Sequence, residues 1–276
     1  MSQNVVNSFI QAFAPEIHML FQQMGSILRN TVELTPNSPN LVGNSDRVQR
    51  LGLGNLTSKG RHAPIPAMNL GHDFVDVPVE DFYGLEWVDK LDQNRTNVNW
   101  RLKYARALAA AAGRKYDDII IDALDATTST GVAVGGAGLT KDKILEAKEL
   151  LDEREVPQDM RFFAIGAHQV NDLFSVVPEF GNQDFVADRP FTMGSLPAQF
   201  LGFRFVLTNR LPIDISDVRT CFAYQSSAVN RASAQEPTPD AFWDGERQSW
   251  GLAISMQVGA KNIEDAGVVE VDCSEA

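Results

Sequence analysis

Apolar residues recur every three or four positions over residues 95–124, and this is the strongest pattern in the chain. The stripe comprises Leu102, Ala105, Ala109, Ala112, Tyr116, Ile119, Ile120 and Ala123, and no proline interrupts it. Such spacing predicts one continuous helix. At 1.5 Å per residue it would be about 45 Å long, whereas a compact chain of this size is about 50 Å across. The sequence therefore predicts a flattened or elongated subunit.

A weaker helical pattern occupies residues 8–28. Its apolar positions are Phe9, Phe13, Ile17, Leu20, Phe21, Met24, Ile27 and Leu28. The spacing is typical of an amphipathic helix. Such a helix would either cover the core of its own subunit or form an arm that docks on a neighbour, and the pattern alone does not separate the two.

Two alternating segments, residues 31–35 and 73–80, predict strands on either side of a long irregular stretch. Pro78 has no N–H to donate, so its strand is expected at an edge or in a solitary ribbon. The stretch between them, residues 35–71, is rich in Gly, Pro, Asn and Ser and has no period. An extended hairpin of this kind is marginal in water. We therefore expect it to lie on another surface.

The second half of the chain mixes helices and strands. Thr140 is placed to cap a helix that has Asp142 in its first turn. Further patterns predict a strand over 161–166, a helix over 167–177, strands over 203–209 and 220–225, and two closing strands within 249–276. The glycine-rich stretch GVAVGGAGLTK lacks the lysine position of a phosphate-binding loop, so we interpret it as a connection. The fold class is α+β.

Charge and cysteine content narrow the class of protein. The chain has 276 residues and a formal net charge of −12, so non-specific binding to nucleic acid is not expected. Cys221 and Cys273 are far apart in sequence, which favours neither a disulfide framework nor a zinc knuckle and suits a reducing compartment. We find no signal peptide and no apolar run long enough to span a membrane.

No motif proposes catalysis or a cofactor. The four histidines, His18, His62, His72 and His168, do not stand at metal-ligand spacing from one another or from a cysteine. There is no Gly-x-Ser-x-Gly elbow and no dinucleotide-binding glycine motif. The sequence therefore predicts a non-enzymatic protein without a cofactor, a metal site or catalytic residues.

The order of these elements resembles a known family. A long two-stranded loop is followed by an alanine-rich helix, ARALAAAAGRKYDDIIIDAL, and then by LTKDKILEAKELLDEREVPQDMRFFAIGAHQVNDLF. This order resembles the major capsid proteins of tailed bacteriophages, which have the Hong Kong 97-type fold. The resemblance implies an N-arm (1–30), an extended loop (31–85), a peripheral domain with the long spine helix (86–126 and 246–276) and an axial domain (127–245).

The resemblance also implies partners. Copies of the chain would self-assemble as hexamers and pentamers into an icosahedral head shell, part of the virion, that encloses phage DNA without specific binding. No long charged segment precedes the N-arm, so we expect a separate scaffolding protein, together with a portal and assembly in the host cytoplasm. One branch of the family crosslinks its subunits through Lys and Asn. Lys59 is the only lysine in 31–85, but no Asn or Glu here can be matched to that reaction.

Charge in the loop suggests where copies meet. Residues 34–72 hold four cations, Arg47, Arg50, Lys59 and Arg61, against one acid, Asp46, which gives a net charge of +3. We expect these cations to reach acidic surface on the next subunit. The candidates there are Asp117, Asp118 and Asp122 on the spine helix, and Asp76 and Glu80 on the returning strand. Alternatively, the cations merely keep the loop soluble.

Two other functions fit the sequence. An encapsulin, the shell protein of a cellular nanocompartment, shares the fold and would form smaller shells around cargo enzymes. An α+β enzyme without a recognisable motif would remain a monomer in solution. Electron microscopy and the oligomeric state separate these alternatives.

Overall fold

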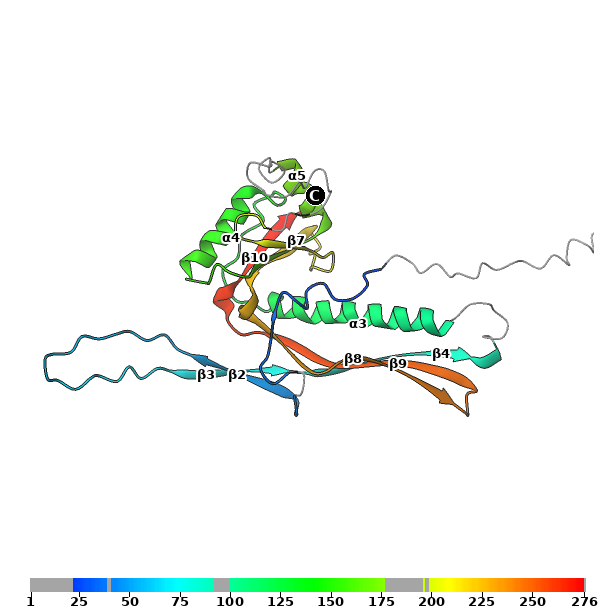
Figure 1. Ribbon diagram of the computed structural model, residues 1–276. Coiled ribbons are helices and arrows are strands. Elements are labelled where there is room, and N and C mark those ends of the chain that lie inside the picture. Colours follow the sequence, from blue (N-terminus) through cyan, green and yellow to red (C-terminus); the bar gives the residue numbers. More distant parts are fainter. Residues whose placement is uncertain (1–21, 39–40, 92–99, 177–195, 197–198, 276) are drawn as a thin grey trace, which may run out of the picture. The chain divides into compact units, whose positions relative to one another are not determined.

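The computed structural model describes residues 22–38, 41–91, 100–176, 196 and 199–275 (Figure 1). It contains helices and several sheets, which confirms the α+β class. The chain forms two compact units. The first comprises residues 1–26, 81–115 and 237–256, and the second comprises residues 27–80, 116–236 and 257–276. Helix α3 (Trp100–Asp125) and strands β8 (Val229–Asp244) and β9 (Ser249–Asn262) each continue from one unit into the other.

The first unit contains most of α3, which confirms the predicted long helix; residues 95–99 of that prediction lie outside the described part. Its 26 residues correspond to about 39 Å. Within this unit β9 lies between β8 and β4 (Glu80–Asp89). Gly84 of β4 lies against the helix, because a Cβ added there would be 3.1 Å from Leu108 Cδ2. Close packing of helix and sheet therefore requires a small residue at this position.

The N-terminal residues of this unit are not helical where they are described. The predicted helix over 8–28 falls outside the described residues up to position 21, and residues 22–28 form bends and turns instead. They pass close to α3, since a Cβ added to Gly113 would lie 2.5 Å from the carbonyl carbon of Gly25. This crossing explains why the interior of a strong helix contains a glycine.

The second unit is built on a four-stranded sheet in the order β10-β7-β5-β6. Its strands are β5 (Arg161–Ile165), β6 (Arg204–Leu207), β7 (Val218–Gln225) and β10 (Val268–Ser274), and they confirm four strand predictions. All five residues of β5 are buried. Phe163 packs edge-on against Phe203, with ring centroids 5.5 Å apart. The core of this unit is therefore completed by its own chain.

Two helices accompany this sheet, α4 (Lys141–Glu153) and α5 (Ala167–Val176). Thr140 is the N-cap of α4, and its hydroxyl accepts a hydrogen bond from the Lys143 backbone N–H, as the sequence predicts. Lys143 itself is buried, and its Nζ donates to the carbonyl oxygens of Val134, Ala137 and Asp272 at 2.7–2.8 Å. The glycine-rich connection is thereby held against β10 by one lysine, which agrees with a structural role.

The hairpin differs from its prediction. Strand β3 (His72–Pro78) pairs with β2 (Ser45–Leu51), not with residues 31–35. Strand β1 (Glu33–Leu34) pairs in parallel with β8 instead. The prediction missed β2 because the more buried face of SDRVQRL carries Asp46 and Arg50 beside Val48, so the alternation is not between apolar and polar residues. Pro78 lies in a two-stranded ribbon, which confirms that expectation.

Two long strands, β4 and β8, were also not predicted from the sequence. None of the described helices is both long and apolar enough to cross a membrane. The thiols of Cys221 and Cys273 are buried and free.

Candidate intersubunit site

The hairpin has a packed root and an exposed tip, and Figure 1 shows strands β2 and β3 continuing into one long loop. At the root, Val77, Val79, Ala232 and Ile263 form a buried cluster, with Leu41, Val48 and Val75 packed against it. The hairpin is therefore fixed to the second unit by apolar contacts.

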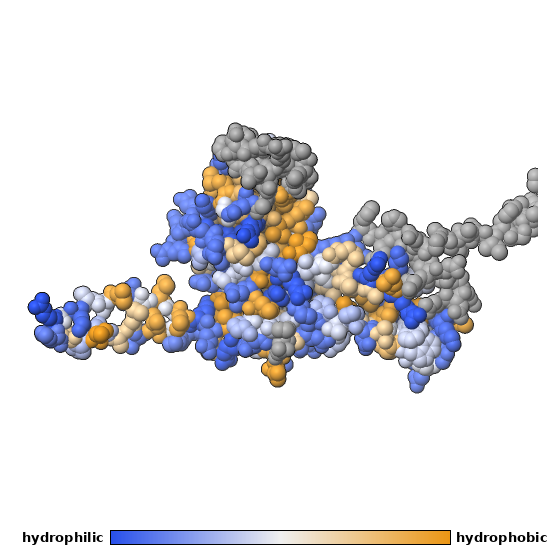
Figure 2. All heavy atoms as spheres, viewed as in Figure 1, coloured by the Kyte–Doolittle hydropathy of each residue, from blue (hydrophilic) through white to orange (hydrophobic). Residues whose placement is uncertain are grey.

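The tip comprises residues 52–71, which have no strand or helix. Its large apolar side chains are among the most exposed in the chain: Leu56 is 95% and Ile65 is 81% accessible. Figure 2 shows apolar and hydrophilic residues side by side along this hairpin. Exposed apolar side chains gathered on one projecting segment mark a contact surface. The tip is thus a part of the second unit whose apolar side chains the described chain leaves uncovered.

The cations of the hairpin strands are paired within the hairpin. Arg47 Nε donates to Asp76 Oδ1 at 2.8 Å across the two strands, and Arg50 forms an ion pair with Asp73. Hydrogen bonds from these arginines lower the pKa of both aspartates. Asp76 was predicted to receive the loop of the next subunit, but here its carboxylate pairs with Arg47 of its own hairpin. Counted over residues 45–78, four cations face three acids, a net charge of only +1.

The cations of the tip have no acidic partner among the described residues. Lys59 and Arg61 are exposed, and Lys59 Nζ donates a hydrogen bond to the Ala63 carbonyl at 3.1 Å. Of the four predicted contact cations, these two are therefore the ones whose charge is available to another molecule.

The predicted acidic face of the spine helix is not a single face. Asp117 is fully buried, and its carboxylate accepts hydrogen bonds from the backbone N–H groups of Ile27 and Leu28 at 3.0–3.1 Å. Asp118 is bound by both Nε and Nη2 of Arg210 at 2.6 Å. Only Asp122 is exposed without such a bond. The expectation for Asp117 is wrong, because adjacent helix residues point about 100° apart and one of them faces the core.

Asp117 belongs instead to an anchor for residues 27–35. Next to it, the Thr31 hydroxyl lies 2.6 Å from the Tyr224 hydroxyl, and both groups are buried. Arg29 forms an ion pair with Glu236 at 3.0 Å. These contacts fix the chain between the N-terminal segment and the hairpin. Sequence reasoning missed them because buried polar residues are recognised by their partners, which are about 90 to 200 positions away.

A buried carboxylate also steadies the hairpin root. Asp46 is almost fully buried and accepts a hydrogen bond from Asn37 Nδ2 at 2.7 Å. Burial opposes its ionisation, but hydrogen bonds from Thr35 and Asn37 outweigh that effect and hold the pKa of Asp46 below its usual value. The charged form is therefore the one that this site accommodates.

The described residues contain no cluster of three or more His, Cys, Asp or Glu that could hold a metal ion. The described arrangement offers contact surface, charge and anchoring.

Comparison with known proteins places these features in a family. A family model described as phage capsid protein matches residues 5–275. The fold is similar to that of a solved chain from Mycobacterium phage Che8, with a TM-score of 0.73 and 21% identity over 95% of this chain and 98% of that one. No curated protein matches the sequence.

Two cyanophage capsids show the same likeness. A chain of the capsid of cyanophage P-SCSP1u has a TM-score of 0.80 at 15% identity, covering 100% of this chain and 96% of that one. A chain of the cyanophage Pam1 capsid has a TM-score of 0.73 at 13% identity, covering 98% and 97%. Of the three functions considered from the sequence, the family match supports the phage capsid. The chain belongs to the phage capsid protein family and is a structural subunit of the phage head shell with the Hong Kong 97-type fold.

Proposed function

We propose that this chain is the major capsid protein and that its copies join through the hairpin tip into hexamers and pentamers of an icosahedral shell around DNA. The observation that carries the proposal is the exposure of Leu56 and Ile65 on a hairpin whose root is firmly packed. Burying one such side chain stabilises a contact by about 1.5–3 kcal/mol. Because every copy repeats the contact, a modest gain per copy is enough to hold a shell.

The domain layout implied by the resemblance needs two changes in this proposal. We retain an N-arm, an extended loop, a peripheral domain around the spine helix and an axial domain. However, β10 pairs with β7 of the axial sheet, so residues 268–274 go with the axial domain rather than with 246–276. Residues 229–244 form β8 beside β9, so they go with the peripheral domain rather than with 127–245.

The acidic chain suits a container for DNA. With a net charge of −12, the subunit releases few counterions from phosphate, and counterion release is what drives non-specific binding. We propose that the shell encloses DNA without holding it, with a separate scaffolding protein and a portal as partners during assembly in the host cytoplasm. A salt-sensitive complex with double-stranded DNA in a gel-shift assay would refute this part.

Removing the tip tests the central proposal. Gly52 and Gly71 are already joined by a backbone hydrogen bond of 2.8 Å. Residues 53–70 can therefore be replaced by Asn-Gly, which closes a two-residue hairpin. We expect the shortened subunit to keep its circular dichroism spectrum and unfolding transition but to form no shells in electron microscopy or light scattering, with scaffold present. Normal shells from this variant, or a wild-type chain that remains monomeric under the same conditions, would contradict the proposal.

A further inference from the structure

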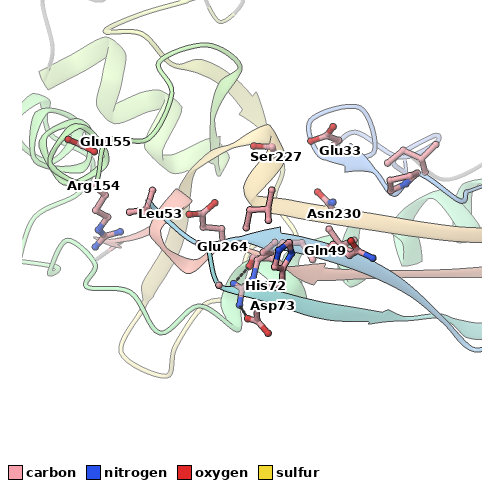
Figure 3. Close-up of a pocket in the computed structure, with 18 residues that line it drawn as sticks. Glu33, Gln49, Leu53, His72, Asp73, Arg154, Glu155, Ser227, Asn230 and Glu264 are labelled. Carbon is pink, nitrogen blue, oxygen red and sulfur yellow. Dashed lines mark hydrogen bonds and ion pairs between the residues drawn. The ribbon is translucent and has the colours of Figure 1, made fainter. Parts of the chain in front are cut away.

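A groove of about 860 Å³ lies at the hairpin root of the second unit (Figure 3). Residues 48–53, from β2 and the start of the tip, form one wall. The opposite side is formed by β1, by the turn after α4, and by residues next to the short helices η1 (Ser226–Ala228) and η2 (Asp265–Gly267). We call it the root groove.

The root groove is acidic. Glu33, Glu155 and Glu264 line it, and none of the three carboxylates makes a hydrogen bond or ion pair with the described part of the chain. Together with Asp73 they face two arginines, which gives the lining a net charge of −2 with His72 neutral.

Both arginines are already occupied. Arg50 Nη1 donates to the Ile263 carbonyl at 2.7 Å and pairs with Asp73, while Arg154 Nη2 donates to the Thr130 carbonyl at 2.9 Å. The lining therefore neutralises few of its own carboxylates, and a cationic occupant would fit it.

A free strand edge at the root groove suits an extended polypeptide. Strand β2 has a strand on one side only. Its other edge can accept main-chain hydrogen bonds from an added segment.

We propose that the root groove receives the hairpin tip of a second copy of this chain, with Lys59 and Arg61 placed against Glu33, Glu155 and Glu264. This inference rests on the proposed function. The tip carries these two cations and no acid, whereas residues 1–21 carry Glu16 and no Lys or Arg. Charge therefore selects the tip over the N-terminal segment.

Apolar surface and reach agree with this assignment. Leu34 and Val48, which are half-buried in the lining, offer apolar contacts for the exposed leucine and isoleucine of the tip. Each arm of the tip has about ten residues and can extend about 33 Å from its own root. A tip placed in the root groove of the next copy is a head-to-tail contact, and such contacts close into rings when the rotation allows. Hexamers and pentamers are rings of this kind.

A charge exchange tests the proposal. The double variant Glu33→Lys with Glu264→Lys, and the double variant Lys59→Glu with Arg61→Glu, are each expected to raise the protein concentration at which shells first form by about tenfold. All four substitutions together are expected to return it to within about twofold of the wild type. The matched control is Glu146→Lys with Glu149→Lys, on the exposed face of α4, which is expected to change assembly little.

The outcomes separate this inference from the proposed function. If the fourfold variant assembles no better than either double variant while all remain folded by circular dichroism, the root groove is not the receptor. If the double variants assemble like the wild type, it is likewise overturned, although the shell function stands. The proposed function is contradicted by different results, namely a wild-type chain that forms no shells or a tip-shortened variant that forms normal ones.

A chemical crosslink provides a second test that does not depend on variants. Shells assembled from a mixture of isotope-labelled and unlabelled protein are treated with a carbodiimide, which joins an amine to a carboxylate in direct contact. We expect peptides that join Lys59 of one copy to Glu33, Glu155 or Glu264 of another, recognised by their mixed labels. Links from Lys59 only to other carboxylates, such as Asp122, or no Lys59 link at all, would overturn the proposal.

Discussion

Strand β5 and the hairpin tip lie in the same unit, but their apolar side chains differ in exposure to solvent. In β5 all five residues are buried, and Phe163 touches two further aromatic rings. In the tip, Leu56 and Ile65 remain almost fully accessible. The apolar side chains of β5 are covered by their own chain, whereas those of the tip are left for another molecule to cover.

Polar groups around the sheet and at the hairpin root also differ in whether they have partners within the chain. Around the sheet, the buried Lys143 has three carbonyl partners, and the buried Asp117 has two backbone donors. At the hairpin root, by contrast, the carboxylates of Glu33, Glu155 and Glu264 are exposed and make no hydrogen bond or ion pair with the described chain. Their negative charge is therefore available to a cationic partner.

The largest expected effect comes from the core. Phe163→Ala removes a fully buried ring that contacts Phe203 and Phe205, so we expect the free energy of unfolding to fall by about 3–5 kcal/mol. Denaturant titration followed by circular dichroism measures it. The matched change in the tip, Leu56→Ala, should shift that energy by less than about 0.5 kcal/mol and yet weaken shell formation. Equal losses of stability at both sites would remove the contrast between them.

The next effect concerns the anchor of residues 27–35. Asp117→Ala leaves the backbone N–H groups of Ile27 and Leu28 without their acceptor, which we expect to cost about 2–3 kcal/mol. Asp122→Ala, five residues along the same helix and exposed, serves as the control and should be nearly neutral. A neutral Asp117 variant in the same denaturant titration would show that the anchor is dispensable.

A smaller effect depends on pH. Arg219 donates to the Glu275 carboxylate at 2.5 Å, and this hydrogen bond lowers the pKa of Glu275 below 4.5. A carboxyl group with a lowered pKa in the folded state stabilises the fold above its unfolded pKa and loses that contribution as the pH falls through the folded value. We therefore expect the wild type to exceed Glu275→Gln in unfolding free energy by about 1 kcal/mol at about pH 6.

That advantage should shrink as the pH falls below about 4, through the lowered pKa of Glu275 in the folded state. Urea titrations of both proteins across this range measure it. A difference that stays constant with pH would mean that the carboxylate contributes through packing rather than through its charge.

The smallest expected effect is at Arg47. Its ion pair with Asp76 is exposed on the hairpin and screened by solvent, so Arg47→Ala should leave the unfolding transition unchanged. Shell formation should also change less than in the Lys59→Glu, Arg61→Glu variant, since Arg47 is already paired within its own hairpin. If Arg47→Ala blocked assembly more strongly than the tip variant, the strands rather than the tip would make the contact.

The sequence by itself determined the parts of this protein that local rules control. Helix α3 was predictable because its apolar stripe keeps one period, and the start of α4 was predictable from Thr140. The order of these elements was also enough to suggest the capsid family that the comparison then showed.

Only the tertiary structure decided which strands pair and which charges remain available. Strand β2 escaped prediction because Asp46 and Arg50 lie on its more buried face, where Asn37 donates to Asp46 Oδ1 and Arg50 donates to the Ile263 carbonyl. Asp117 resembled a surface acid until the structure showed its two backbone donors. The root groove likewise draws its walls from segments more than 200 positions apart. Hydrogen bonds and ion pairs act over a few ångströms in space, and the sequence does not record which distant residues folding brings within that range.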